Sequence, residues 1–232
     1  MSTPAARLAP SPHTTAADPA TELAERLRAQ YADRITGELV VPARDGQYAP
    51  LPDGLDPRLA AALAGRGVTR FYTHQAAALD RARSGANVLA VTPTASGKTL
   101  CYNLPVLQSV LTEGAKALYL FPTKALAQDQ VAELIELNLA GELGVRAFTF
   151  DGDTPGDARQ AVRTRGDIVV TNPDMLHQGI LPQHARWHRF FTHLKYVVID
   201  EVHAYRGVFG SHLANVMRRL RRVCAHYGAS PV

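Results

Sequence analysis

Continuous apolar runs alternate with helical stretches along most of this chain, and this alternation restricts the fold more than any other feature. Five short runs are apolar almost throughout rather than at every second position: residues 87–92, 115–121, 145–150, 167–171 and 194–199. Such runs are typical of strands covered on both faces. The stretches between them are helical in pattern: residues 98–111, 124–139, 155–163 and 173–180. The order predicts an α/β fold, with a mostly parallel sheet and helices on both faces.

Length and composition allow this fold without disulfides or a structural metal. The chain has 232 residues, of which 46% are hydrophobic and 20% charged, and a chain of this size can bury roughly 70% of its unfolded surface. Its two cysteines, Cys101 and Cys224, lie far apart, so we interpret both as reduced thiols of a cytoplasmic protein. No stretch approaches the roughly 18 consecutive apolar residues of a membrane helix, so we expect no membrane partner.

The composition divides the chain into three expected parts. Residues 1–19 are rich in Ala, Pro, Ser and Thr, which is typical of a disordered tail. Residues 20–66 are predicted to form an N-terminal helical extension, because a proline follows an acidic cap residue at Asp18-Pro19 and again at Asp56-Pro57. Residues 67–232 contain the alternating strands and helices and are predicted to form the α/β lobe.

The segment from Thr92 to Thr99 has the composition and position of a phosphate-binding loop. It reads Thr-Pro-Thr-Ala-Ser-Gly-Lys-Thr, after a predicted strand and at the start of a predicted helix. Small residues let backbone N–H groups approach phosphate oxygens, and the helix N-terminus favours an anion. Lys98 can reach the β- and γ-phosphates, and the Thr99 hydroxyl can bind Mg²⁺. We therefore predict ATP and Mg²⁺ as cofactors, with nucleotide contacts from Thr94, Ala95, Ser96, Gly97, Lys98 and Thr99.

The loop departs from the usual pattern at one position, because Thr92 stands where the first glycine is expected. The competing interpretation is an ordinary strand-to-helix turn that happens to contain Gly-Lys-Thr. A second motif favours the nucleotide site. The last predicted strand ends in Asp200-Glu201-Val202-His203, at the sheet edge where the phosphate loop also lies. Asp200 is placed to serve the metal, and Glu201 to act as general base on water, so Lys98, Asp200 and Glu201 are the predicted catalytic residues.

With these motifs, the chain resembles the superfamily 2 helicases of the DEAD/DEAH-box group, from about Phe71 onward. The resemblance implies a RecA-like P-loop NTPase lobe. Phe71-Tyr72-Thr73-His74-Gln75 is similar to the family motif upstream of the phosphate loop, in which the glutamine reads the adenine edge. It implies that Gln75 recognises the base through its carboxamide, which offers a donor and an acceptor, and that Phe71 stacks or packs near the base.

Three further segments resemble the family's nucleic-acid contact motifs, and each follows a predicted strand. They begin at Phe121-Pro122, at Asp151-Gly152 and at Thr171-Asn172. Each could also be a loop with a helix cap, but their common position at strand ends favours an aligned track for backbone phosphates. The predicted nucleic-acid contacts are Pro122, Thr123, Lys124, Gly152, Asp153, Thr171, Asn172 and Pro173.

The Asp-Glu-Val-His tetrad and the residues after it resemble a narrower branch, related to the bacterial mitomycin-repair helicase and the yeast RecQ4-like helicase. That resemblance implies translocation on single-stranded DNA in the 3′→5′ direction and a role in DNA repair. Family members also have a second RecA-like lobe and a Ser-Ala-Thr coupling motif, neither of which follows Glu201 here. We therefore interpret the chain as a piece of a larger helicase, with little ATP turnover of its own.

Two other interpretations remain open at this stage. The same fold could serve an RNA helicase or the motor of a restriction or remodelling complex, or it could be a nucleotide-binding module without turnover. A cluster of arginines, Arg218, Arg219, Arg221 and Arg222, lies on a predicted C-terminal helix. Because such a cluster spreads round a helix, we interpret it as a solvated surface or an interface to the second lobe rather than a nucleic-acid face.

Overall fold

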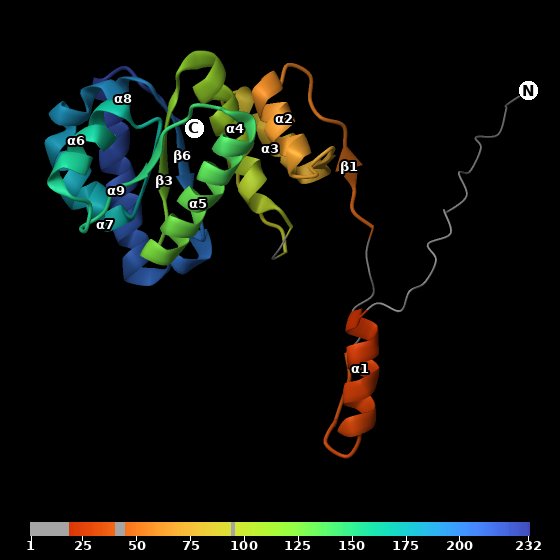
Figure 1. Ribbon diagram of the computed structural model, residues 1–232. Coiled ribbons are helices and arrows are strands. Elements are labelled where there is room, and N and C mark those ends of the chain that lie inside the picture. The colour runs from red at the N-terminus through yellow and green to blue at the C-terminus, as the bar shows by residue number, and fades with distance from the viewer. Residues whose placement is uncertain (1–18, 40–44, 94–95) are drawn as a thin grey trace, which may run out of the picture. The chain divides into compact units, whose positions relative to one another are not determined.

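The computed structural model describes residues 19–39, 45–93 and 96–232 (Figure 1). The chain divides into two compact units, Met1–Asp45 and Gly46–Val232. The first contains α1 (Pro19–Gln30), which begins at the proline that the sequence indicated, and its Arg28 forms an ion pair with Glu38. The predicted tail, residues 1–19, lies outside the described residues except for Pro19.

A four-stranded parallel sheet forms the centre of the second unit. The strands lie in the order β4-β5-β3-β6, and every neighbouring pair is parallel. They span Ala147–Thr149 (β4), Ile168–Thr171 (β5), Lys116–Leu120 (β3) and Leu194–Ile199 (β6). Four of the five predicted strands are therefore confirmed, and so is their parallel arrangement.

Helices cover both faces of this sheet, as predicted (Figure 1). Alternate residues of β3 enter two different cores, because side chains along a strand point to opposite faces. Ala117 and Tyr119 pack into the first core, and Leu118 and Leu120 pack into the second. The first core is closed by α2 (Pro57–Gly65), α3 (Thr73–Arg83), α4 (Lys98–Glu113) and α5 (Lys124–Gly141). The second is closed mainly by α6 (Gly156–Arg165), α8 (His188–Thr192) and α9 (Gly207–His226).

Short helical pieces connect β5 to β6 and β6 to α9. They are α7 (Pro173–Met175), the π-helical η1 (Leu176–Ile180), and the 3₁₀ pieces η2 (Leu181–Trp187) and η3 (Val202–Ala204). Trp187 at the end of η2 is completely buried, and its ring meets that of Phe150 edge-on at 4.9 Å. This connection gives the second core its largest side chain.

The predicted strand at residues 87–92 is wrong. Residues 86–93 have no regular secondary structure, and Leu89 and Val91 are 74% and 82% exposed. The physical reason is that an apolar run becomes a strand only where a neighbouring strand pairs with it. The outer edge of β6 pairs instead with Val232, whose N–H donates to Lys195 O at 2.9 Å and whose carbonyl accepts from Val197 N at 2.8 Å.

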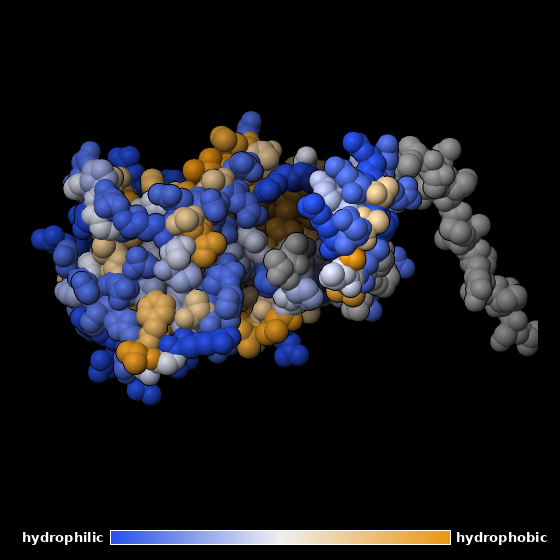
Figure 2. All heavy atoms as spheres, turned by 90° about the horizontal axis from the view of Figure 1, so that it is seen from below, coloured by the Kyte–Doolittle hydropathy of each residue, from blue (hydrophilic) through white to orange (hydrophobic). Residues whose placement is uncertain are grey.

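The compact body begins earlier than the predicted lobe boundary at residue 67. Leu59 and Leu63 of α2 are buried in the same core as β3, and β1 (Tyr48–Ala49) pairs antiparallel with β2 (Phe71–Tyr72). Seen from below the view of Figure 1, the surface is mostly hydrophilic, with hydrophobic residues in scattered patches (Figure 2). Within the described part of the chain, no helix combines the length and apolar character needed to span a bilayer.

Candidate functional site

The predicted phosphate loop leads directly into α4, as the sequence indicated. Gly97 is the N-cap of this helix and has a φ of 73°, which favours glycine. A Cβ there would lie 2.5 Å from Gln75 Nε2, so a larger residue would have to displace the buried Gln75 carboxamide. The N-terminal amides of a 16-residue helix are therefore presented beside the loop, which is an arrangement suited to anions. Thr94 and Ala95 lie outside the described residues.

Lys98 is folded back onto the loop. Its Nζ donates to the carbonyl oxygens of Thr92 at 3.0 Å and Pro93 at 3.2 Å. The hydroxyl of Thr92, which stands where a glycine was expected, lies 2.6 Å from the Ser96 hydroxyl. Charged acceptors form stronger hydrogen bonds with an ammonium group than carbonyls do. A phosphate placed at the loop would therefore compete well for Lys98.

The start of α3 is tied to the phosphate loop by side chains. The Gln75 carboxamide is almost completely buried; its Oε1 accepts from Tyr72 N at 2.9 Å and its Nε2 donates to Gly97 O at 2.9 Å. His74 Nε2 lies 3.1 Å from Ser96 O. Gln75 thus holds the loop in place, and these two bonds leave one N–H and one lone pair of its carboxamide unused.

Aromatic residues beside this contact form a stack that the sequence analysis missed. Phe71 is completely buried in the core, so it supports the site from inside rather than facing it. The rings of Tyr48 and Tyr72 stack at 4.9 Å, and those of Tyr72 and His74 at 5.5 Å. The Arg70 guanidinium lies 3.6 Å from the Tyr48 ring centroid. The pairing of β1 with β2 creates the stack, and no sequence pattern links Tyr48 to Tyr72.

The acidic tetrad lies at the carboxyl end of β6, as predicted. The Asp200 N–H donates to Leu120 O at 3.1 Å, which continues the pairing with β3. Asp200 Oδ1 accepts from the Glu201 N–H at 2.7 Å, and Oδ2 accepts from the Tyr102 hydroxyl at 3.0 Å. The Asp200 carboxylate is therefore held in one orientation by two donors.

Tyr102, which the sequence analysis also missed, connects the two halves of the site. Its hydroxyl, which carries a single proton, donates to Asp200 Oδ2 at 3.0 Å and lies 2.8 Å from the side-chain amide of Gln130. Burial raises the pKa of Tyr102 well above its ordinary value, and the negative charge of Asp200 raises it further. The phenol therefore stays neutral and keeps its proton. No sequence signal marks Tyr102, because the contact depends on how α4 packs against β6.

Glu201 has an unusual backbone conformation for a residue with a side chain. Its φ is 50°, in the left-handed region, which costs such residues about 1–2 kcal/mol. Its Oε2 lies 3.1 Å from His203 Nδ1, and both side chains are well exposed. Strained backbone of this kind is frequent at functional sites.

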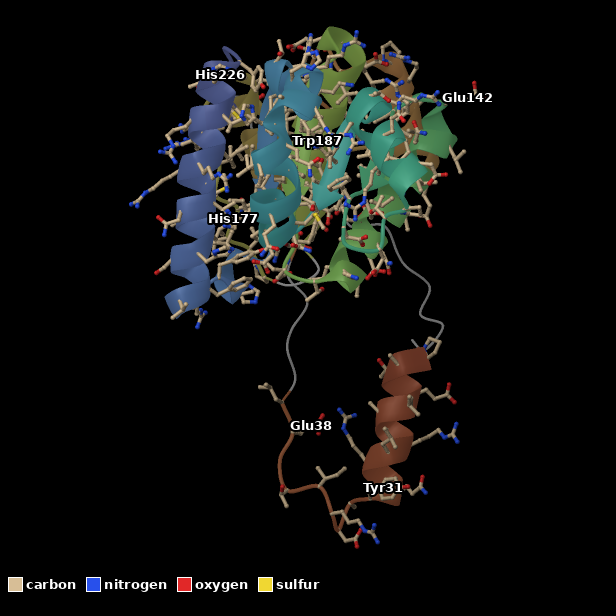
Figure 3. All side chains as sticks on the ribbon, turned by 90° about the vertical axis from the view of Figure 1, so that its left-hand side faces the viewer. Tyr31, Glu38, Glu142, His177, Trp187 and His226 are labelled. Carbon is tan, nitrogen blue, oxygen red and sulfur yellow. The ribbon has the colours of Figure 1, made fainter. Side chains whose placement is uncertain are left out.

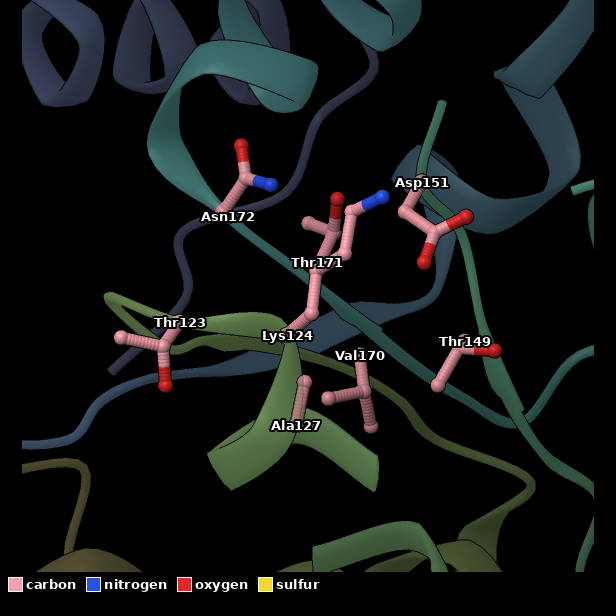
Figure 4. Close-up of a pocket in the computed structure, with 8 residues that line it drawn as sticks. All are labelled: Thr123, Lys124, Ala127, Thr149, Asp151, Val170, Thr171 and Asn172. Carbon is pink, nitrogen blue, oxygen red and sulfur yellow. The ribbon is translucent and has the colours of Figure 1, made fainter. Parts of the chain in front are cut away.

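The predicted nucleic-acid contacts lie at the carboxyl ends of β3, β4 and β5. Eight residues from these ends and from the start of α5 line a narrow pocket (Figure 4): Thr123, Lys124, Ala127, Thr149, Asp151, Val170, Thr171 and Asn172. Pro122, Gly152, Asp153 and Pro173 lie on the same connections. We call this set the strand-end cluster. Of the eight predicted nucleic-acid contacts, Thr123, Lys124, Thr171 and Asn172 line this pocket together.

Several side chains of the strand-end cluster are engaged within the protein. The Thr123 hydroxyl caps α5 by accepting from Leu126 N at 3.4 Å, and Asn172 Oδ1 accepts from Met175 N at 2.8 Å. The buried Thr171 hydroxyl donates to Phe150 O at 2.6 Å. These contacts leave backbone amides and the outward side chains as the groups that could meet a phosphate.

Lys124 is the one lysine of the strand-end cluster. It forms an ion pair with Asp153, which raises the pKa of Lys124 and lowers that of Asp153. Figure 4 shows Lys124 extending past Thr171 toward Asp151. Both Lys124 and Asp153 are exposed, so a phosphate could replace Asp153 as the partner of the lysine at little cost.

Comparison with known proteins agrees with this geometry. The sequence model of the DEAD/DEAH box helicase family matches residues 72–230. The chain belongs to the DEAD/DEAH box helicase family. It is 56% identical over 190 residues to the uncharacterized ATP-dependent helicase YprA of Bacillus subtilis, and 44% identical over 193 residues to the ATP-dependent helicase hrq1 of Schizosaccharomyces pombe. Each match covers 82% of this chain, but only 25% and 18% of those helicases. The chain thus spans about a quarter or less of their length.

Solved helicase structures confirm the RecA-like fold. The DUF1998 helicase MrfA bound to DNA matches 83% of this chain and 26% of its own, with 55% identity and a TM-score of 0.81. MrfA bound to DNA and AMPPNP matches 91% of this chain and 30% of its own, with 51% identity and a TM-score of 0.83. The DEAD-box helicase Mss116, at 22% identity and a TM-score of 0.66, shares the fold. The predicted family and fold are therefore confirmed.

Proposed function

We propose that this chain is the ATP-binding motor lobe of an ATP-dependent DNA helicase or translocase. One observation carries the proposal beyond family membership. Tyr102, three residues after Thr99 in α4, donates to Asp200 Oδ2 at 3.0 Å, so the start of α4 lies beside the end of β6. This contact supports a common site for Thr99 and Asp200, the two predicted metal ligands.

The side chains present fit a nucleotide with Mg²⁺. Thr99 and Asp200 would offer oxygen ligands, which Mg²⁺ prefers, and the hydrogen bond from Tyr102 of α4 to Asp200 supports a shared site for them. The metal would neutralise charge on the phosphates. Lys98 would leave the carbonyls of Thr92 and Pro93 to bind the β- and γ-phosphates. Ser96 and Gly97 would contribute backbone amides beside the helix N-terminus.

Base recognition and water activation fall to two other residues. Gln75 would contact the adenine edge with the N–H and lone pair that its bonds to Tyr72 and Gly97 leave free. Glu201 would accept the proton of the attacking water, since its exposed carboxylate lies next to the fixed Asp200. Fast hydrolysis would also need an arginine from a second RecA-like lobe, which is worth on the order of 10³–10⁵ in rate in related nucleotide hydrolases.

Single-stranded DNA is the proposed nucleic acid, held along the strand-end cluster. The support is that the relative solved with DNA, MrfA, is 55% identical, whereas the relative solved with single-stranded RNA, Mss116, is 22% identical. The backbone amides after β4 and β5, together with Lys124, offer phosphate contacts without base readout. The 3′→5′ direction and a role in DNA repair remain predictions from the resemblance.

Nucleotide titration tests the first part of the proposal. A fluorescent ATP analogue with Mg²⁺ should bind the wild-type chain, and Lys98→Ala should weaken binding by about 10-fold to 100-fold, because charge-assisted hydrogen bonds are lost. Lys195→Ala is the matched control, since Lys195 forms an ion pair with Glu113 on the surface, away from the loop. Equal binding by the Lys98→Ala variant, or none by the wild type, would refute the nucleotide site.

Competition between nucleic acids tests the second part. A labelled single-stranded DNA bound to the chain should be displaced by unlabelled DNA at lower concentration than by RNA of the same sequence. Stronger competition by RNA would favour the RNA-helicase interpretation. Binding of nucleotide without binding of either nucleic acid would favour a nucleotide-binding module.

A further inference from the structure

A basic groove runs along α9, outside the nucleotide site and the strand-end cluster. Four arginines of this helix, Arg218, Arg219, Arg221 and Arg222, line it together with His177 of η1 and His212. Its volume is about 570 Å³ and it is open to the surface. Figure 3 shows His177 beside α9 and nitrogen-bearing side chains extending from the outer side of that helix. We call this surface the α9 groove.

The four arginines of the α9 groove are not balanced by carboxylates, although the Asp174 carboxylate lies beside His212 at the start of the groove. Within the described ranges, none of the four arginines forms an ion pair. Arg218 contacts only the neutral Asn215, and Arg219 donates to the ring nitrogen and the carbonyl of His177. The helix itself contains no acidic residue. Four guanidinium groups that share one groove therefore favour a polyanionic occupant.

The α9 groove continues from the strand-end cluster. Asp174, two residues after Asn172, lies 3.0 Å from His212 Nε2, and the rings of His177 and His212 meet edge-on at 5.4 Å. The groove therefore begins beside the connection that carries the third predicted nucleic-acid contact. From His212 to Arg222 the helix rises about 15 Å, a length of duplex axis that carries about four phosphates on each strand.

We propose that the α9 groove binds the phosphate backbone of the DNA segment that continues from the strand-end cluster. The inference rests on the proposed DNA-binding function and adds a second contact surface to it. It replaces the interpretation of the arginines as scattered round the helix. Arg218 and Arg222 lie one turn apart on the same side of the helix, and Arg219 and Arg221 line the same groove. Guanidinium forks suit phosphate oxygens and carry no sequence preference there.

Salt dependence of DNA binding provides the test. The double variant Arg218→Gln/Arg222→Gln removes two exposed charges that no ion pair uses. On single-stranded DNA, the slope of log affinity against log salt should become shallower by about 1.4, and on duplex DNA by about 1.8, because each lost phosphate contact contributes about 0.7 or 0.9. A slope change on only one of the two substrates identifies whether a single strand or a duplex occupies the groove.

Two controls separate this surface from general charge and from folding. Arg163→Gln/Arg165→Gln removes the same charge from the last turn of α6 and should leave the slope unchanged. Arg218→Lys/Arg222→Lys keeps the charge and should restore most of the slope. Unchanged thermal unfolding of all variants shows that the fold is intact.

Three results would overturn the proposal. A slope for the groove variant equal to that of the α6 control would make the α9 groove a protein interface or a solvated surface. A wild-type chain that binds no DNA would also refute the proposal. Nucleotide binding that depends on Lys98, together with an unchanged DNA slope, would refute the groove while leaving the nucleotide site standing.

Discussion

Two segments that look alike in the sequence differ sharply in the structure. Residues 87–92 and 194–199 are both short apolar runs, and each leads directly into a functional motif. The second run is β6, which pairs with β3 on one edge and with Val232 on the other. The first run is not a strand, and its Leu89 and Val91 are largely exposed.

The difference shows that an apolar run records a tendency to be buried but does not provide the neighbour that buries it. The acidic half of the site is held by the backbone pairing of β6 with β3, which extends to Asp200. The phosphate-loop half is held by side-chain hydrogen bonds from Gln75, His74 and Lys98. We therefore expect the loop half to open locally at lower free energy than the sheet half.

The largest difference in unfolding free energy should come from truncating one leucine in the sheet and one in residues 87–92. Leu118 of β3 is completely buried, and Leu118→Ala should lower the free energy of unfolding by about 2–5 kcal/mol, because it leaves a cavity. Leu89 is 74% exposed, and Leu89→Ala should change it by less than about 0.5 kcal/mol. Urea unfolding of both variants measures this. Similar losses would show that residues 87–92 are packed as a strand in solution.

A smaller effect is expected from the ion pairs that brace the opposite end of the sheet. Asp167, just before β5, is buried and accepts from Lys116 Nζ at 2.6 Å and from Arg146 Nε at 2.9 Å. Asp167→Ala should cost about 2–4 kcal/mol, toward the lower end because half of the Arg146 side chain is exposed. The control Asp129→Ala, on the exposed side of α5, should change little.

The stability contribution of the Asp167 carboxylate should depend on pH. Burial alone would raise the pKa of Asp167, but hydrogen bonds from Arg146 and Lys116 outweigh it and hold the pKa below its ordinary value of 3.8. Its contribution is therefore complete above that value and is lost as the pH falls through the lower folded pKa. The stability gap between wild type and Asp167→Ala should shrink in acid. A gap that widens below about pH 4 would contradict this.

The smallest effect on stability should come from Tyr102, which links the phosphate-loop half of the site to the acidic half. Tyr102→Phe removes the hydroxyl that donates to Asp200, and should lower stability by about 1–2 kcal/mol. Tyr196→Phe, which loses a hydroxyl contact of 3.1 Å to Ser109 in the core, should cost a similar amount. Only the Tyr102 variant should weaken nucleotide binding in the presence of Mg²⁺ and not in its absence. The same Mg²⁺ response from both variants would show that Tyr102 is merely structural.

Long elements with strong local signals were predicted closely. The helix expected at residues 124–139 is observed as α5, and the strand expected at 194–199 is β6 without a shift. The connection through η2 and α8 was missed, because pieces this short lack helical periodicity. It is shaped instead by the burial of Trp187, Phe190 and Phe191 against the sheet.

Local composition was enough to predict the fold class and the location of the site. Apolar runs, caps and small-residue loops act over a few residues, so they placed Lys98, Asp200 and the strand-end cluster on the correct elements and at one edge of the sheet. Contacts between distant segments determined the rest. Tyr102 reaches Asp200, four arginines share one groove, and residues 87–92 remain unpaired. Each of these depends on which surfaces pack together. Hydrogen bonds and burial between residues far apart in the sequence produce no local sequence pattern, so they cannot be predicted from it.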